Sequence, residues 1–129
     1  MRFLVDTHVA IWLVNETERI PSTVLSQLSD KANEVFVSAA TVWEIAIKHP
    51  LRRADAPPFS AGQSLVEFPA AGLTMLPISA MHAAAVETLP LLHSDPFDRI
   101  IVAQSRTEPM RLVTHDATLL RYEPTALLF

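Results

Sequence analysis

Short runs of apolar residues alternate with longer amphipathic segments along this chain. The runs predict four strands, at Phe3–Val5, Glu34–Ser38, Leu73–Ile78 and Arg111–Thr114, and the residues Ala126–Phe129 predict a fifth strand at the sheet edge. The first run is continuously apolar, which is typical of a strand that is buried on both faces. This pattern favours a sheet in the interior of the molecule.

Helical patterns lie between the predicted strands. Ser38, Ser79 and Asp95 are suitable N-caps, and Pro50 and Pro90 are suitable terminators. The resulting helices are His8–Val14, one that begins at Pro21, Ala39–His49, Ala61–Phe68, Ala80–Leu89, Pro96–Thr107 and Ala117–Leu120, with a loop at Leu51–Ser60. Alternating strands and helices predict an α/β protein with a parallel sheet.

The composition agrees with a folded globular chain. Half of the 129 residues are apolar and 19% are charged, so one domain over residues 1–129 is expected. The chain has no cysteine, which excludes disulfides and thiolate metal sites, and it has no apolar stretch long enough for a bilayer. We expect no signal peptide, no membrane partner and a cytoplasmic location. The net charge of -4 argues against binding nucleic acid through bulk charge alone, although a local basic patch can still bind it.

Several acidic residues are predicted to lie along one edge of the sheet. Asp6 and Asp116 follow strands directly, Asp95 and Asp98 begin a helix, and Glu44 lies in the helix after the second strand. The carboxyl ends of parallel strands share one edge, and ligands of open α/β sheets bind there. Four or five carboxylates in one cleft repel each other unless a cation sits among them or some stay protonated. Their oxygen atoms suit Mg²⁺ or Mn²⁺, and such ions support phosphoryl chemistry.

Each of these residues also has a simpler interpretation. Asp6, Asp95 and Asp116 are suited to capping helices or forming turns, and Asp98 fits a helix first turn equally well. Glu44 differs, because the helix around it is apolar and a buried acid is rare unless it is paired or bound to metal. Thr114 is either ordinary strand filler or a hydroxyl for the water shell of a metal. Trp12, Trp43 and Phe97 are expected in the core.

Taken together, four segments resemble the PIN-domain ribonucleases, and more closely the VapC-type toxins of bacterial toxin–antitoxin pairs. The segments are Leu4–His8, Val42–Ile45, His93–Gln104 and Leu112–Asp116, and they span nearly the whole chain in order. The resemblance implies a three-layer α/β/α fold with a central, mainly parallel sheet of four or five strands. It also implies a Mg²⁺- or Mn²⁺-dependent endoribonuclease that cuts RNA such as tRNA or rRNA, forms a homodimer and is inhibited by a cognate antitoxin.

The resemblance assigns the family's four acids to Asp6, Glu44, Asp98 and Asp116. We expect Asp6 and Asp98 to hold the main ion directly, and Glu44 and Asp116 to position the attacking water or a second ion. Asp95 and Thr114 are auxiliary candidates. The candidates for contacts with RNA phosphates are basic residues, each of which also fits an ordinary surface charge: Lys48, Arg52, Arg53 and Arg99.

Two other classes of function remain open from the residues alone. An Asp at a strand end also serves as the phosphoacceptor of receiver-like domains, although the second Asp and the strand-end Lys of that pattern are absent. Alternatively, the acids form a non-catalytic cleft that binds arginines of another protein. A phospho-adduct would favour the former, and failure to cut any RNA with Mg²⁺ or Mn²⁺ would favour the latter.

Overall fold

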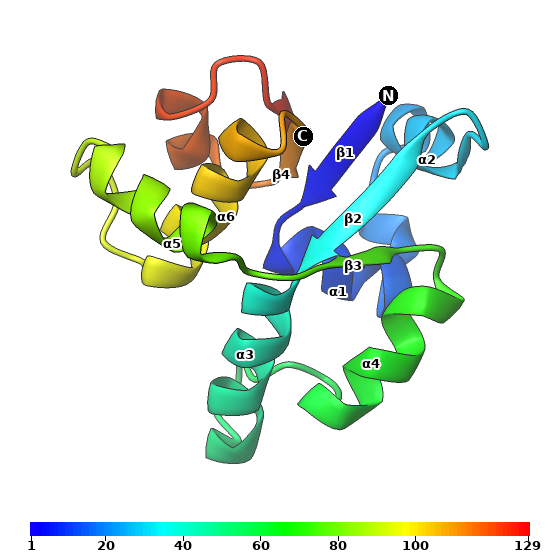
Figure 1. Ribbon diagram of the computed structural model, residues 1–129. Coiled ribbons are helices and arrows are strands. Elements are labelled where there is room, and N and C mark those ends of the chain that lie inside the picture. Colours follow the sequence, from blue (N-terminus) through cyan, green and yellow to red (C-terminus); the bar gives the residue numbers. More distant parts are fainter.

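The computed structural model describes all residues, 1–129, and has a five-stranded sheet at its centre (Figure 1). The strands are β1 (Arg2–Val5), β2 (Glu34–Ser38), β3 (Thr74–Leu76), β4 (Arg111–Thr114) and β5 (Leu127–Leu128). Their order is β3-β2-β1-β4-β5, and every neighbouring pair is parallel. In the central register, Leu4 lies between Phe36 of β2 and Leu112 of β4. The predicted parallel α/β architecture is confirmed.

Helices cover both faces of this sheet. They are α1 (Thr7–Asn15), α2 (Ser22–Ser29), α3 (Ala39–Lys48), α4 (Ala61–Ala70), α5 (Ala80–Ala85) and α6 (Pro96–Thr107), with 3₁₀ turns at Thr17–Arg19, His49–Leu51, Val86–Thr88 and Ala117–Arg121. Figure 1 shows α5 and α6 on one side of the sheet, and α1, α2 and α4 on the other. The molecule is therefore the expected three-layer sandwich.

Alternate side chains of β1 enter two separate hydrophobic cores. Phe3 and Val5 pack in one core with residues of α1, α2 and α4, whereas Leu4 packs in the other with residues of α6. All three side chains are at most 1% exposed. A strand with apolar residues at consecutive positions is stable only in this central place, because both of its faces need a hydrophobic partner.

Some predicted elements end elsewhere than expected. The helix predicted at 80–89 is α for six residues and then continues as the 3₁₀ turn Val86–Thr88, and the segment after β4 is also 3₁₀. The helix predicted to stop at Phe68 continues through Pro69 to Ala70. Gly72 then takes a left-handed conformation, with φ of +86°, which closes that helix end.

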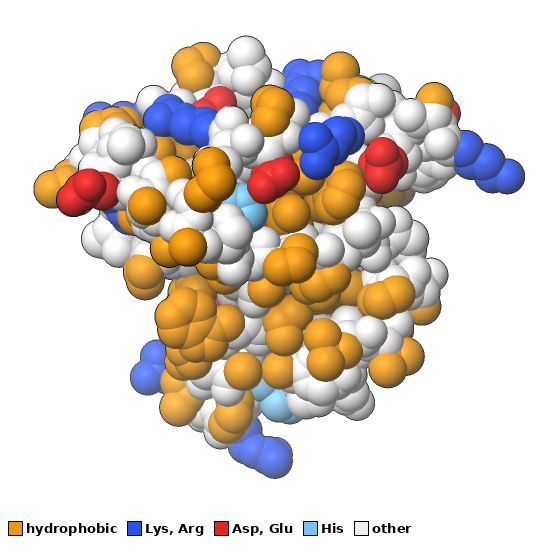
Figure 2. Space-filling view, in the orientation of Figure 1, with side chains coloured by type: hydrophobic (Ala, Val, Ile, Leu, Met, Phe, Trp, Pro, Cys, Tyr) orange, Lys and Arg blue, Asp and Glu red, His pale blue; other side chains and the backbone are white.

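The assignment of Trp43 to the core was wrong. Its side chain is 58% exposed on α3, where it meets the ring of Phe97 edge-on at 5.1 Å between centroids. Further exposed hydrophobic side chains belong to the same region: Ile47 and Leu51 after it along the chain, and Leu65 and Val66 on α4. We call these five residues the α3–α4 apolar surface. Figure 2 shows hydrophobic side chains gathered over this part of the molecule.

No helix here combines the length and the apolar character that crossing a membrane would require.

Candidate functional site

The candidate site lies where the direction of chain winding reverses. From β1 the sheet is extended in one lateral direction by β2 and then β3. The chain later returns to add β4 along the opposite edge of β1. Beyond the carboxyl ends of β1 and β4, α1 and the 3₁₀ turn Ala117–Arg121 pack in opposite cores. This is the crevice in which open α/β sheets bind ligands. Asp6 follows β1 and Asp116 follows β4, so the crevice carries two carboxylates.

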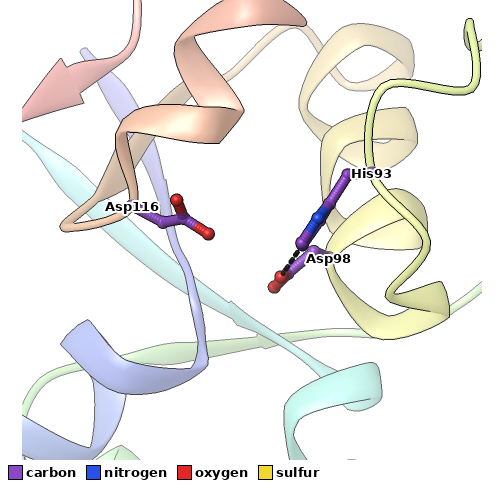
Figure 3. Close-up of side chains that lie close together, drawn as sticks. All are labelled: His93, Asp98 and Asp116. Carbon is purple, nitrogen blue, oxygen red and sulfur yellow. Dashed lines mark hydrogen bonds and ion pairs between the residues drawn. The ribbon is translucent and has the colours of Figure 1, made fainter.

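The first turn of α6 brings a third carboxylate to the same place. Asp95 caps this helix by accepting hydrogen bonds from the backbone N–H groups of Phe97 and Asp98. The side chain of Asp98 takes no part in the cap, and its Oδ2 lies 2.8 Å from Nε2 of His93. Figure 3 shows Asp116 facing the His93–Asp98 pair across a gap. One ligand atom from each of these three residues lies within 4.8 Å of the others.

The carboxylates that follow β1 and β4 and the carboxylate of Asp98 line one cavity of about 500 Å³. Its wall contains the carboxylates of Asp6, Asp98 and Asp116, and its other side chains are His8, Trp12, Arg19 and His115. We call it the acid cavity. A further hollow of about 380 Å³ lies at the opposite, amino-terminal ends of β2 and β3 and contains none of the predicted acids.

Burial disfavours the ionised form of Asp6. The residue is 3% exposed, and its carboxylate accepts hydrogen bonds from the Val9 N–H and the Thr114 hydroxyl. Burial raises the pKa of Asp6 to about 6, with a further upward contribution from Asp98, although these hydrogen bonds and His8 lower it. The carboxylate is therefore held in a place that disfavours its own negative charge, and a bound cation would relieve that cost.

Asp98 is in a similar position. Burial raises the pKa of its carboxyl, and the negative charges of Asp95 and Glu44 raise it further, whereas the hydrogen bond and charge of His93 lower it. The mutual effects of these acids show that separate segments have placed their charges close together.

Glu44 reaches the neighbourhood from α3 but lines a second cavity. It is 5% exposed, its Oε1 accepts a hydrogen bond of 2.9 Å from the Thr7 hydroxyl, and its Oε2 lies 2.5 Å from Nζ of Lys48. The second cavity, of about 370 Å³, shares His8, Trp12 and Arg19 with the acid cavity and extends to the loop 54–58. We call it the loop cavity. Glu44 thus has a lysine partner within the chain, whereas no lysine or arginine is paired with the three acids of the acid cavity.

Thr114 has a more specific position than ordinary strand filler. Its hydroxyl donates to Oδ2 of Asp6 and accepts from the backbone N–H of Asp116, at 2.9 Å. It is fully buried. Thr114 therefore couples the two acids that follow β1 and β4 and fixes their spacing.

The structure separates the four basic candidates. Lys48 lines the loop cavity; partial burial lowers its pKa, but the hydrogen bond to Glu44 and the charges of Glu44, Asp95 and Asp98 outweigh this and raise it. Arg53 lines a small hollow beside Lys48, and the exposed Arg52 is left-handed, with φ of 53°. Arg99 is not brought to either cavity. Its guanidinium donates to the carbonyls of Pro90, Val86 and Leu89 and to the Tyr122 hydroxyl, and so holds the segment before α6.

Sequence reasoning missed several residues of the site. Thr7 forms a hydrogen bond with Glu44, and His93 forms one with Asp98. Both residues belong to the motif segments that contain Asp6 and Asp98, so the sequence offered a signal for them. Trp12 was expected in the core, yet it is only partly buried and lines both cavities. Its apolar neighbours in sequence give no sign of this position.

Comparisons with known proteins agree with this fold. The family model for the PIN domain matches residues 3–123. No protein of curated function matches the chain by sequence.

Among solved structures, the chain resembles VapBC2 from Rickettsia felis, bound to a DNA fragment from its promoter, with a TM-score of 0.70 and 16% identity over 100% of this chain and 98% of that one. It also resembles VapBC-1 from nontypeable Haemophilus influenzae (TM-score 0.65, 15% identity, 100% and 97% covered). A third is FitAcB from Neisseria gonorrhoeae (TM-score 0.61, 19% identity, 98% and 96% covered). At these identities the likeness establishes a common fold.

Proposed function

This chain belongs to the PIN domain family, and we propose that it is a metal-dependent endoribonuclease, the toxin of a VapBC-type toxin–antitoxin pair. The observation that carries the proposal is the convergence of Asp6, Asp98 and Asp116 on one cavity at the switch point of the sheet. These carboxylates come from three separate segments of the chain. Burial raises the pKa values of two of the carboxylates, those of Asp6 and Asp98.

The donor set fits a hard divalent cation. Carboxylate oxygens are the ligands that Mg²⁺ and Mn²⁺ favour, and no arginine or lysine is paired with Asp6, Asp98 or Asp116. Asp6 and Asp98 would hold the ion directly, and Asp116 and Glu44 would orient the attacking water or a second ion. When bound, such an ion supplies an activated water and neutralises charge at the phosphate.

Other side chains keep these groups in position. Thr114 fixes Asp6 relative to Asp116. The Thr7 hydroxyl donates to Glu44 and forms a second hydrogen bond with the Thr41 hydroxyl. Lys48, beside Glu44, is the basic residue best placed to meet an RNA phosphate in the loop cavity, and Arg53 lies next to it. Arg52 remains a candidate on the exposed loop, whereas the contacts of Arg99 assign it to holding the chain before α6.

The partner assignment is supported by the solved structures that share the fold. Those from Rickettsia felis and Haemophilus influenzae are of VapBC proteins, and one from Klebsiella pneumoniae is described as a toxin–antitoxin complex. We infer that an antitoxin protein binds this chain and blocks cleavage of RNA.

The test of the catalytic proposal is metal-dependent cleavage measured together with metal binding. We expect purified protein to cut a mixed pool of tRNA and rRNA in Mg²⁺ or Mn²⁺ and to stop when EDTA is added. The same ions are expected to raise the melting temperature, because an ion that binds only the folded state stabilises it by mass action. Protein that shows the shift but cuts no RNA would support the non-catalytic acidic-cleft alternative instead.

We further propose that the α3–α4 apolar surface pairs with a second copy of the chain. Exposed apolar surfaces of this kind mark interaction sites. Four of the five residues lie on α3 and α4, which contact each other, and Leu51 lies in the 3₁₀ turn that follows α3. Light scattering is expected to give a mass of twice the 14.3 kDa chain, and the double substitution Ile47→Glu with Val66→Glu should reduce it to one chain. Met81→Glu, on the exposed face of α5, serves as the matched control. A wild-type monomer would overturn the proposal.

A further inference from the structure

Four aromatic side chains from distant parts of the chain meet beside the acid cavity. His8 and Trp12 come from α1, His115 follows β4, and Phe129 ends the chain next to β5. The ring centroid of Trp12 lies 5.2 Å from that of His115 and 6.1 Å from that of His8, and His115 lies 5.4 Å from Phe129. We call these four residues the aromatic wall.

The wall faces the cavities as well as the core. His8 and His115 are exposed and Trp12 is partly exposed, and all three line the acid cavity together with Asp6, Asp98 and Asp116. His8 and Trp12 also line the loop cavity. The wall therefore lies at the junction of the two cavities and within the same hollow as the carboxylates.

The backbone at the end of the chain holds this arrangement in place. Nδ1 of His115 is within hydrogen-bonding distance of the Phe129 carbonyl, and the Phe129 N–H donates to the Thr114 carbonyl. The guanidinium of Arg19 lies 5.3 Å from the centroid of the Trp12 ring and lines both cavities, and it is ion-paired with Glu16. An aromatic surface with a cation beside it is the combination that proteins use to bind unstacked bases of single-stranded RNA.

We propose that the aromatic wall is a base-binding subsite, which accepts one unpaired nucleobase of the RNA strand whose phosphate lies at the acid cavity. This inference rests on the proposed function and assigns the residues that contact a base of the substrate. A base within a duplex stays stacked on its neighbours and presents only its edges, so it cannot lie against these rings. Contact with the aromatic wall therefore requires that this base be unpaired.

The test measures whether a ligand gains affinity from its base. In the full chain carrying Trp43→Phe, Trp12 is the only tryptophan, so its fluorescence reports on the wall. The probes are adenosine 5′-monophosphate, uridine 5′-monophosphate and ribose 5-phosphate, each titrated in Mg²⁺. We expect both nucleotides to quench Trp12 and to bind about 10-fold or more tightly than ribose 5-phosphate, because stacking on an aromatic ring contributes at this level for each base.

A pair of substitutions then separates binding from a purely structural role. Trp12→Leu is expected to lose the preference for nucleotides by calorimetry while keeping its affinity for ribose 5-phosphate, and Trp12→Phe is expected to keep the preference. If Trp12→Leu does not fold, the fluorescence titrations of the Trp43→Phe protein still decide the question. Equal affinity for nucleotides and ribose 5-phosphate, or no response to either, would overturn the proposal.

The outcome is distinguishable from failure of the proposed function. A protein that cuts RNA with Mg²⁺ but shows no preference for nucleotides retains its nuclease assignment and lacks the subsite. A protein that prefers nucleotides but cuts no RNA retains the subsite and lacks the activity. Cleavage of a hairpin only in its paired stem would also overturn the inference.

Discussion

Asp6→Asn is expected to abolish metal-dependent RNA cleavage while leaving the fold intact. The substitution keeps the size of the side chain and its acceptor for the Val9 N–H, but it removes the charge that would bind the cation. Loss of a residue that merely supports a metal ligand typically costs 10- to 100-fold in metal affinity or activity, so loss of a direct ligand should cost more than about 100-fold. The measurement is the initial rate of cleavage of the tRNA and rRNA pool in Mg²⁺, with circular dichroism to verify folding.

The control for this experiment is Glu87→Gln. It removes the same amount of charge from the exposed turn after α5, outside both cavities, and should cleave at the wild-type rate. Wild-type cleavage by a folded Asp6→Asn protein would remove the central residue from the proposed site. It would also remove the reason for placing the cation there.

In metal-free buffer, the same Asp6→Asn substitution is expected to stabilise the protein at neutral pH. The pKa of Asp6 is about 6 in the folded chain and near its ordinary value of 3.8 in the unfolded chain. Between these values the folded state binds more protons than the unfolded state, so the stability of the wild type falls as the pH rises from about 4 to 6. Each pKa unit corresponds to 1.36 kcal/mol, so this penalty is about 3 kcal/mol above pH 6. Asparagine does not titrate and therefore avoids the penalty.

The stability experiment compares urea unfolding of the two proteins in EDTA at several pH values. The two proteins should be similar near pH 4, and the variant should be more stable by about 3 kcal/mol at pH 7.5. Glu87→Gln should not reproduce this gain. A difference between wild type and Asp6→Asn that is constant across pH would contradict the burial argument. In Mg²⁺ the order is expected to reverse, because only the wild type gains stability from binding the ion.

These two expectations describe one trade-off. The carboxylate that makes the site useful is unfavourable in the folded chain without a cation, and its removal benefits the fold while ending the proposed activity. Stabilisation through loss of function is common at sites of this kind.

Much of the fold could be predicted because local patterns and tertiary structure agree. The segments Glu34–Ser38 and Arg111–Thr114 are strands with the predicted bounds, and Pro96–Thr107 is a helix with Asp95 as its cap. In each of them the hydrophobic period and the end signals point to the same element. Errors occurred where such signals conflict with packing. Pro69 was expected to lie beyond its helix, yet the helix continues past it until Gly72 closes the end.

The candidate site was predictable to a different degree for each residue. Asp6 and Asp116 follow strands, so the parallel sheet alone places them at one edge. Glu44 stood out because an acid in an apolar helix requires a partner, and the structure supplies Lys48 and Thr7. The division between the acid cavity and the loop cavity was not predictable, because it depends on the direction in which α3 presents Glu44. The exposure of Trp43 had no local signal either, because it depends on which helices leave α3 uncovered.

The sequence by itself determined the order of strands and helices, the acids at their ends and the resemblance to the PIN domain, because periodicity, capping and motif spacing are local properties. Only the tertiary structure decided that β4 returns to the free side of β1, and this single crossover brings Asp116, Thr114 and His115 beside Asp6 and Trp12. Contacts between residues more than 100 positions apart depend on how the whole chain packs its two cores. For that reason the aromatic wall and the shared cavity can be identified only in the folded molecule.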